Sequence, residues 1–342
     1  MHRMTGPPSR ASRKRPAPWA SDARGSQHGK SGMILCCGEA LIDMIPTPTG
    51  AGAEGFVPHS GGAIFNTAIG LGRLGVPTGF LSGLSTDLFG QQLVSDLAAS
   101  HVSADYAVRS DLPTTLAFVR LSGGQASYTF YDENTAGRML EPEQLPHLSP
   151  DVTALYFGGI SLISEPCAEF YAALALRDGA QRVIMLDPNI RPGFIRDEAR
   201  YRARLDRMMV GADILKVSDE DLDWILPGSG TTEDKAMSIT EKGVRIVIVT
   251  RGSAGASAHF TDGRAVSVPA QKAVVVDTVG AGDTFNSGVL AHLSRAGFLS
   301  KARIKDIGPA DMEDALALGA RVAAVTVARA GANPPWAQEL NL

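Results

Sequence analysis

Short, almost continuously apolar segments alternate with longer segments of helical pattern along this chain of 342 residues. The apolar segments are Met33–Gly38, Gly79–Gly83, Ala154–Gly158, Val183–Asp187, Ile214–Val217 and Ile246–Thr250. The helical segments include Gly90–His101, Pro166–Arg177, Glu198–Val210 and Met312–Ala328. Strands without polar alternation are typical of a parallel sheet that helices cover on both faces. The sequence therefore predicts an α/β fold, a three-layer α/β/α arrangement with a mostly parallel central sheet.

Composition limits the class of protein. With 44% hydrophobic residues the chain can bury one large core. The most apolar helical segment, Ala315–Ala328, is interrupted by Arg321, and no apolar run reaches the roughly 18 residues of a membrane span, so we expect no membrane partner. The three cysteines, Cys36, Cys37 and Cys167, lack CxxC spacing. A cytoplasmic protein is expected.

Residues 1–32 differ from the rest of the chain, because they carry seven Lys or Arg residues and one Asp and show no apolar periodicity. The remaining residues hold 25 basic and 35 acidic side chains, a balance that does not indicate a nucleic-acid partner. We expect a disordered basic leader over 1–32 and one domain over 33–340. A misassigned start, with translation beginning at Met33, is favoured over a targeting role.

Two glycine-rich strings match nucleotide-binding patterns only superficially. Gly25–Ser31 has three residues between its glycines where a P-loop needs four, and no strand precedes it. Gly70–Gly75 lies within and just after the helical pattern Asn66–Leu74, where small residues serve close packing and Gly75 ends the helix. Neither string predicts a phosphate or dinucleotide site.

One segment, about 113–131, breaks the α/β rhythm. Thr114–Leu121 and Ala126–Tyr131 alternate with period two around Ser122–Gln125, which predicts a β-hairpin. Together with the extended segment of about 44–60, this hairpin would form a small sheet, a lid that excludes water from the strand ends. An ordinary edge hairpin is the alternative.

The strongest chemical signal is Asp277–Asp283, a glycine-rich turn that leads directly into the helix-like stretch Thr284–Leu290. The backbone N–H groups of Gly280, Ala281 and Gly282 and the positive end of the helix dipole would bind an anion. The same turn also holds the carboxylate of Asp283, which would repel an anion that is only bound there and does not react. This pairing indicates chemistry in which N–H groups stabilise developing negative charge while Asp283 accepts a proton.

Three stretches resemble the ribokinase-like, PfkB-type carbohydrate kinases: Asp277–Leu290, Gly61–Ala68 and Thr250–Gly255. The resemblance extends from Met33 to about Trp336. Within the family, Gly38–Asp43, Asp187–Pro192 and Phe130–Ala136 are most similar to bacterial fructokinases. The resemblance implies transfer of the γ-phosphoryl group of ATP to a hexose hydroxyl, most simply of fructose. The alternatives are 2-keto-3-deoxygluconate, ribose or a nucleoside as substrate, and a noncatalytic sugar-binding protein.

The resemblance also assigns residues to the two substrates. It implies that Asp283 is the base and Gly280–Asp283 the anion hole, and it places Arg191 near the phosphoryl group, although a surface arginine is the alternative. The substrate-binding residues that it implies, with two candidate lining residues from the hairpin, are Asp43, Gly61, Gly62, Asn66, Phe118 and Arg120. The implied ATP-binding residues are Ser218, Thr250, Gly252, Gly255 and Asn333. A turn or cap role is the alternative for Asp43 and for Asn66.

Two metal sites and a quaternary arrangement are also implied. The family usually has a glutamate where this chain has Asp221, and with Glu220 it would lie near a hydrated Mg²⁺, although acidic residues also stabilise a helix start. Asp277 and the carbonyl of Val279 match one loop of a K⁺ site. A homodimer through the lid strands and a monomer with an exposed lid are both compatible with the hairpin.

Overall fold

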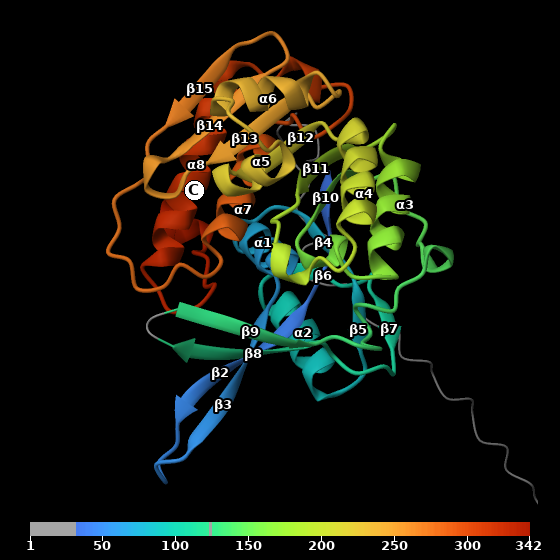
Figure 1. Ribbon diagram of the computed structural model, residues 1–342, viewed down its shortest axis with the longest axis vertical. Coiled ribbons are helices and arrows are strands. Elements are labelled where there is room, and N and C mark those ends of the chain that lie inside the picture. Colours follow the sequence, from blue (N-terminus) through green and yellow to red (C-terminus); the bar gives the residue numbers. More distant parts are fainter. Residues whose placement is uncertain (1–31, 123–124) are drawn as a thin grey trace, which may run out of the picture. The chain divides into compact units, whose positions relative to one another are not determined.

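The computed structural model describes residues 32–122 and 125–342, so the expected leader up to residue 31 and the hairpin turn at 123–124 lie outside it. Within the described residues, nine strands form the central sheet (Figure 1). In spatial order they are β15 (Ala265–Val268), β14 (Ala256–Phe260), β13 (Ile246–Thr250), β12 (Ile214–Ser218), β11 (Val183–Asp187), β10 (Val152–Gly158), β1 (Met33–Cys37), β4 (Thr78–Leu81) and β6 (Val102–Ser103). The neighbours from β13 to β6 are parallel, which confirms the predicted sheet.

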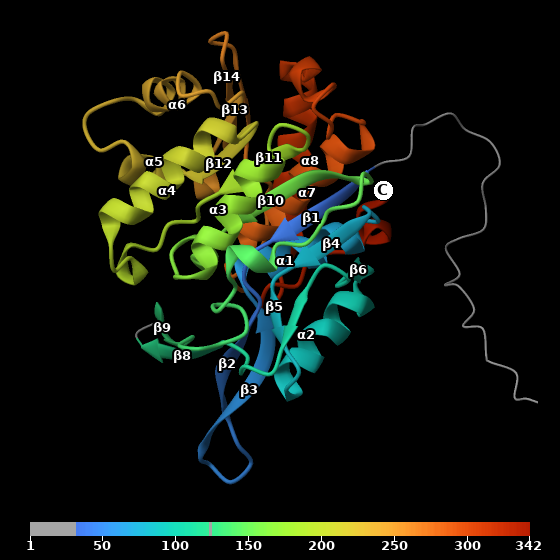
Figure 2. The same cartoon turned by 90° about the vertical axis from the view of Figure 1, so that its right-hand side faces the viewer.

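Helices cover both faces of this sheet (Figure 2). One face carries α1 (Ala63–Arg73), α2 (Leu88–Ala99), α7 (Ala281–Arg295) and α8 (Pro309–Val327), and the other carries α3 (Cys167–Asp178), α4 (Glu198–Gly211), α5 (Asp219–Ile225) and α6 (Thr232–Thr240). Alternate residues of one strand face opposite cores: Ile34 packs with the first group of helices, and Leu35 packs with the second. Burial on both faces explains why the strands are continuously apolar in the sequence.

The antiparallel edge of the sheet was absent from the prediction. β14 and β15 pair antiparallel with β13 and with each other. Their sequences mix Ser, His and Ala with few large apolar residues, so a search for apolar runs passes over them.

The glycines of Gly70–Gly75 behave as expected, because Gly70 and Gly72 lie within α1 and Gly75 follows it with a φ of +77°. None of the helices in the described part of the chain is long and apolar enough to cross a membrane.

A second, four-stranded sheet projects beyond the central one (Figure 1). Its order is β3 (Glu54–Gly61), β2 (Leu41–Pro48), β8 (Leu116–Ser122) and β9 (Gln125–Tyr131), and the pair β5 (Gly83–Ser85) and β7 (Val108–Ser110) lies apart from it. β8 and β9 form the predicted hairpin. Residues that stand opposite one another share a face, so Asp43, Ala117 and Phe130 lie on one side of this sheet.

Candidate active site

The helix α7 begins without a side-chain cap. Its N-cap residue is Gly280, whose backbone is left-handed with a φ of +75°, and a Cβ there would lie only 2.5 Å from the Cβ of Ala332. Glycine is the residue that tolerates both conditions. No side chain caps the first turn; the N–H of Ala281 donates to the carbonyl of Thr278 at 3.3 Å, and the N–H groups of Gly282 and Asp283 have no protein acceptor among the described residues. The structure therefore keeps the arrangement that the sequence predicts for an anion site.

Asp283 lies in the first turn of α7 and is buried, with 9% of its surface exposed. Its Oδ2 accepts a hydrogen bond from Asn66 Nδ2 at 2.9 Å, and its carbonyl oxygen accepts one from Thr67 Oγ1 at 3.0 Å. The pKa of Asp283 is raised to about 7, chiefly by burial; the hydrogen bond from Asn66 and the charge of Lys216 oppose this rise, and the charges of Asp187 and Glu39 add to it. A carboxylate with a pKa near neutrality suits a general base.

Asn66 comes from α1, where it is the fourth helical residue and not the N-cap. The N-cap is Gly62, with a φ of +108°. Beneath this turn the carboxylate of Glu39 accepts hydrogen bonds from the backbone N–H groups of Ala63 and Ser161, at 3.0 Å and 3.3 Å, and burial raises the pKa of Glu39. Glu39 therefore ties the start of α1 to the turn that follows β10, and α1 carries the amide of Asn66 to Asp283.

A cavity of about 530 Å³ lies between the second sheet and the start of α7. Its lining includes Asp43, His59, Gly61, Phe65, Asn66, Val119, Tyr128, Asp277, Val279 and Asn333. The carboxylate of Asp43 lies against Gly61, because a Cβ on that glycine would stand 2.2 Å from Asp43 Oδ2. Burial raises the pKa of Asp43 to about 6. Asp43 belongs to β2, so the alternative of a turn or cap role is wrong.

The hairpin contributes different residues to the cavity from those predicted. Val119 and Tyr128 stand opposite each other on one face of the second sheet and line it. Phe118 lies on the other face, where its ring contacts Phe56 and Tyr131 edge to face, at centroid distances of 5.0 Å and 5.5 Å. Arg120 is two residues from Phe118 and shares that face. The prediction that Phe118 and Arg120 line the cavity is therefore corrected to Val119 and Tyr128.

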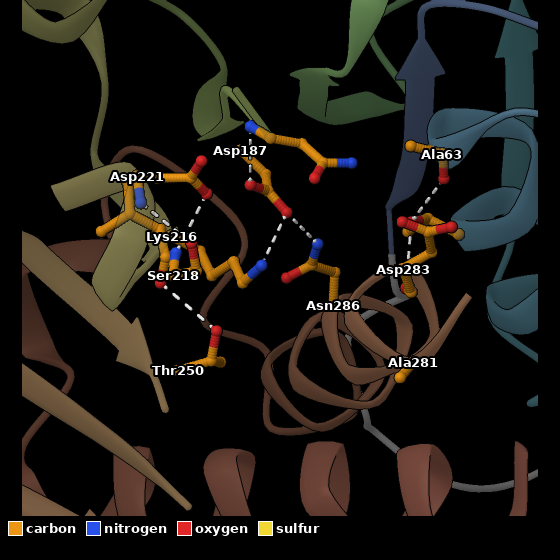
Figure 3. Close-up of polar contacts among 12 residues, drawn as sticks. Ala63, Asp187, Lys216, Ser218, Asp221, Thr250, Ala281, Asp283 and Asn286 are labelled. Atoms are coloured by element: carbon orange, nitrogen blue, oxygen red, sulfur yellow. Dashed lines mark hydrogen bonds and ion pairs between the residues drawn. The ribbon is translucent and has the colours of Figure 1, made fainter. Parts of the chain in front are cut away.

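A buried polar group behind the first turn of α7 was not predicted (Figure 3). Asp187, at the end of β11, accepts hydrogen bonds on Oδ2 from Lys216 Nζ at 3.0 Å and from Asn286 Nδ2 at 2.6 Å. Asn286 also donates to the hydroxyl of Tyr156 at 2.8 Å. The signal was present in the sequence, since Asp187 and Lys216 lie at or near the carboxyl ends of adjacent strands, where ligands gather in parallel sheets.

The acidic residues before and in α5 cap that helix. Ser218 Oγ accepts from the N–H of Asp221 at 3.0 Å, and Asp221 Oδ2 accepts from the N–H of Ser218 at 3.1 Å. Asp221 Oδ1 also accepts from the N–H of Ile190 at 3.0 Å, and burial raises the pKa of Asp221. Glu220 is exposed. Among residues 32–122 and 125–342, no three His, Cys, Asp or Glu side chains form a group that could hold a metal, so the expected carboxylate cluster does not converge.

The remaining predicted residues lie on turns around the same strand ends. Thr250 ends β13, and its hydroxyl donates to the carbonyl of Val217 at 3.4 Å. Gly252 and Gly255 belong to the turn between β13 and β14. Arg191 follows β11 and donates to the carbonyl of Ile190 at 3.0 Å. The structure thus brings all four to the carboxyl end of the sheet.

Two predicted residues join the loops that border the cavity. Asp277 accepts hydrogen bonds from the N–H groups of Val279 and Gly331, at 3.0 Å and 2.8 Å. Asn333, predicted on the nucleotide side, lines the cavity with Asp43, and its Oδ1 accepts a hydrogen bond from Arg73 at 2.7 Å. The loop after α8 is therefore fixed beside the start of α7.

Known proteins share both this sequence and this fold. The chain matches the description "pfkB family carbohydrate kinase" over residues 31–339. It is 51% identical over 275 residues to the fructokinase of Rhizobium leguminosarum bv. trifolii, an alignment that covers 80% of this chain and 84% of that protein.

Two solved structures show the same arrangement of elements. The fructokinase from Xylella fastidiosa with bound ATP superposes with a TM-score of 0.82 at 28% identity, covering 91% of this chain and 98% of that one. The aminoimidazole riboside kinase from Salmonella enterica, complexed with aminoimidazole riboside and an ATP analog, gives 0.77 at 25% identity and covers 90% and 98%. The matches confirm the ribokinase-like fold and the resemblance that the motifs carry, and this chain belongs to the pfkB family of carbohydrate kinases.

Proposed function

We propose that this kinase transfers the γ-phosphoryl group of ATP to a hydroxyl of fructose, with Asp283 as the base. The observation that carries the proposal is the uncapped first turn of α7, which holds a buried carboxylate of pKa about 7 next to a cavity lined by polar groups. Relatives of two kinds support the choice of sugar, because the 51% identical protein and a 28% identical solved structure are both fructokinases.

The mechanism assigns a role to each part of this turn. The sugar oxygen attacks the γ-phosphorus, the bond from phosphorus to the bridging oxygen of ADP breaks, and the hydroxyl proton passes to Asp283. The N–H groups of Gly280–Asp283 stabilise the charge on the transferring group. General-base catalysis contributes about 10²–10⁴ in rate. Asn66 holds the carboxylate toward the cavity, since its amide donates to Asp283 Oδ2.

Sugar and nucleotide approach Asp283 from two sides in this proposal. Asp43 and Asn66 bind sugar hydroxyls from the cavity, and Gly61 and Gly62 let the backbone approach the ring. Ser218, Thr250, Gly252 and Gly255 contact the nucleotide at the ends of β12 and β13. The second sheet closes over the sugar as a lid that excludes water.

Mg²⁺ enters this proposal with the nucleotide. It neutralises phosphate charge and keeps most of its waters, so it needs few protein ligands. Asp221 fits the role of a hydrogen-bond acceptor for such a water, because its two oxygens face the buried group of Figure 3 while each accepts one backbone N–H. A K⁺ ion at Asp277 and the carbonyl of Val279 is a secondary proposal, which full activity with tetramethylammonium in place of K⁺ would remove.

The test is ADP release by the full chain with ATP and Mg²⁺ and one acceptor at a time. Fructose, ribose, 2-keto-3-deoxygluconate, adenosine and aminoimidazole riboside are compared by kcat/KM. Fructose is expected to give the highest value. A higher value for aminoimidazole riboside or adenosine would replace the sugar by a nucleoside and leave the transfer chemistry standing, whereas no release with any acceptor would refute the kinase assignment of this site.

A further inference from the structure

We infer that the chain has a second sugar site, in a cavity between β9 and the starts of α3 and α4, where Glu165 and Tyr201 bind the hydroxyl groups of the sugar. The cavity has a volume of about 360 Å³ and shares no lining residue with the 530 Å³ cavity of the candidate active site. The inference therefore goes beyond the proposed function, and it does not depend on which acceptor is phosphorylated.

Three parts of the chain that are distant in sequence form the walls of this cavity. Phe130 comes from β9, Glu165 from the segment before α3, Phe194 from the loop before α4, and Tyr201 from α4 itself. The helices α3 and α4 lie side by side on one face of the central sheet (Figures 1 and 2). The rings of Phe130 and Phe194 meet edge to face, with their centroids 4.8 Å apart. The cavity therefore has an aromatic wall.

The hydroxyl of Tyr201 is the first observation that points to a ligand. Only 1% of the surface of Tyr201 is exposed, and its hydroxyl has no hydrogen-bond partner in the described part of the chain. Burial raises the pKa of this hydroxyl, so it stays neutral and can both donate and accept a hydrogen bond. A buried polar group without a partner is unfavourable unless a ligand or a water completes it.

The carboxylate of Glu165 is the second observation. Its Oε1 is paired with Arg204 and, at 3.1 Å, with Arg200. Its Oε2 is buried and accepts no hydrogen bond from the residues that the structure describes. The cavity thus holds an acceptor that needs a donor, and a hydroxyl that needs a partner. Hydroxyl groups of a ligand meet both needs, because each can donate and accept.

The charges of the walls favour hydroxyl groups over an isolated anion. Four arginines and three carboxylates line the cavity. Arg138 pairs with Asp132 at 2.9 Å, and the buried guanidinium of Arg204 pairs with Glu165 and Glu169. The buried guanidinium charge is therefore neutralised within the protein. An anion would compete with these carboxylates, whereas a neutral ligand leaves the pairs intact.

A sugar combines the features that these walls recognise. Its hydroxyl groups suit Glu165 and Tyr201, and the C–H groups of its ring faces pack on aromatic side chains such as Phe130 and Phe194. Two sources share this chemistry, a free sugar and a sugar phosphate. The second would direct its phosphate to Arg200, whose side chain is 54% exposed. The alternative is that water molecules alone complete the two groups.

Equilibrium dialysis of the full chain against radiolabelled fructose, without nucleotide, tests the inference. Wild type is expected to bind two fructose molecules per chain. Asp43→Asn is expected to lose the one in the candidate active site. Tyr201→Phe is expected to weaken the other about five- to tenfold, the effect of one hydrogen bond. Fructose bound once per chain, lost in Asp43→Asn and unaffected by Tyr201→Phe, would overturn the inference and leave the proposed function standing.

The opposite result separates the two proposals. Fructose bound once per chain, unaffected by Asp43→Asn and weakened by Tyr201→Phe, would remove fructose as the acceptor and support the second site. Turnover gives a further check, because Tyr201 has no role in the proposed transfer. Tyr201→Phe is therefore expected to keep kcat/KM for the acceptor within twofold of wild type.

Tyr171→Phe is the matched control. Tyr171 is also buried, but its hydroxyl donates to the carbonyl of Gly38 at 3.2 Å, so its loss removes a hydrogen bond of the fold. Tyr171→Phe is expected to lower thermal stability and to keep the second fructose, whereas Tyr201→Phe is expected to keep thermal stability and to weaken it. Equal weakening by both variants would show a disturbed fold and not a lost contact.

A third variant keeps the inference testable if Tyr201→Phe folds poorly. Phe194 is 37% exposed, so Phe194→Ala removes aromatic surface from the cavity without opening the core. It is expected to weaken the second fructose as well, and unchanged binding in both Phe194→Ala and Tyr201→Phe would overturn the inference.

Displacement distinguishes the sources of the ligand. In Asp43→Asn, the labelled fructose that remains is challenged with unlabelled fructose, fructose 6-phosphate or inorganic phosphate. Stronger displacement by fructose 6-phosphate than by fructose would identify a sugar phosphate as the ligand, and the reverse order would identify the free sugar. Either order supports a site for sugar hydroxyl groups. Displacement by inorganic phosphate as strong as by both sugars would show an anion site and overturn the inference.

Discussion

The helices α5 and α7 both begin beside the buried group around Asp187, but their first turns are built in opposite ways (Figure 3). In α5 the side chains of Ser218 and Asp221 each accept the other's backbone N–H. In α7 the N-cap is Gly280, and no side chain accepts from the first turn. Capping uses N–H groups of α5 within the protein, whereas in α7 the N–H of Ala281 donates to the carbonyl of Thr278 and those of Gly282 and Asp283 are available to a ligand. A helix start can serve the fold or a substrate, and these two divide the roles.

The carboxylates of the two turns differ in the same sense. Asp221 is fixed by two backbone N–H groups, from Ser218 and Ile190. Asp283 accepts a single side-chain hydrogen bond, from Asn66, which leaves room for a proton on its other oxygen. Burial raises the pKa of both, yet only Asp283 combines a raised pKa with an open first turn. The comparison assigns proton transfer to α7 and anchoring to α5.

The largest effect is expected from Asp283→Asn. The change keeps the shape of the side chain and removes its ability to accept the hydroxyl proton, so kcat is expected to fall by about 10²–10⁴. Sugar binding and the fold should persist. Steady-state kinetics and calorimetric titration with fructose check both points, with Asp221→Asn as the comparison from α5. Turnover near the wild-type rate would show that Asp283 is not the base.

Gly280→Ala comes next, with an expected fall in kcat of about 10². A side chain at a φ of +75° is strained, and its Cβ would meet Ala332 at 2.5 Å, so the first turn must shift. Gly263→Ala is the matched control, because Gly263 has a φ of +81° but no neighbouring atom within 4 Å of its Cβ position. The control should lose some stability and keep its kcat. A comparable loss of kcat in both variants would contradict a role for the turn itself.

The catalytic efficiency, kcat/KM for the sugar, is expected to depend on pH through the ionisation of Asp283. With a pKa of about 7, Asp283 is mostly protonated at pH 6 and mostly ionised at pH 8, so kcat/KM for the sugar is expected to rise about tenfold between these values. Stability runs in the opposite direction, because the folded state holds this proton more tightly than the unfolded chain. That contribution is full below pH 4 and is lost as the pH rises through about 7. Denaturation of Asp283→Asn should therefore show a gain over wild type at pH 8 that vanishes at pH 4.

The same comparison of the two helix starts shows which parts of the site could be predicted from the sequence. Asp277–Asp283 predicted an anion site because glycines before a helix have a local meaning that does not depend on tertiary packing. The segment Ser218–Asp221 was compatible with two interpretations, a helix cap and a metal site. The sequence did not distinguish them, and the observed hydrogen bonds favour the cap. The group of Asp187, Lys216 and Asn286 joins three separate elements, so the sequence could place two of its members near strand ends but could not predict the hydrogen bonds that join all three.

The second sheet carries the other lesson. Period-two alternation predicted β8 and β9, but alternation alone does not say which face meets the cavity. Phe118 was predicted to line the cavity, and the structure places Val119 and Tyr128 there instead. The register that links β2 to β8 decides this, since Asp43 stands beside Ala117. Such a register between distant segments lies beyond single-strand patterns.

A smaller effect is expected from Ser218→Ala. Loss of the cap on α5 should lower the free energy of unfolding by about 1 kcal/mol. Thr231→Ala removes the same kind of cap from α6, where Thr231 and Asp234 bond reciprocally, and serves as the control. Urea denaturation should give similar losses for both. If Ser218 also contacts ATP, only Ser218→Ala raises the KM for ATP, by about fivefold, the effect of one hydrogen bond. An unchanged KM would leave Ser218 as a cap alone.

The smallest effect is expected from Glu220→Gln, with kcat and the half-saturating Mg²⁺ concentration both within twofold of wild type. Glu220 is exposed, and the carboxylates of its turn do not converge on a metal within the described residues. Titration of activity with Mg²⁺ at saturating ATP measures this, beside Asp221→Asn, which should raise the Mg²⁺ requirement if a metal-bound water contacts Asp221. A tenfold rise in the half-saturating Mg²⁺ concentration for Glu220→Gln would mean that α5 binds the metal through its exposed carboxylate. The start of α5 would then have a ligand-binding role as well as the start of α7.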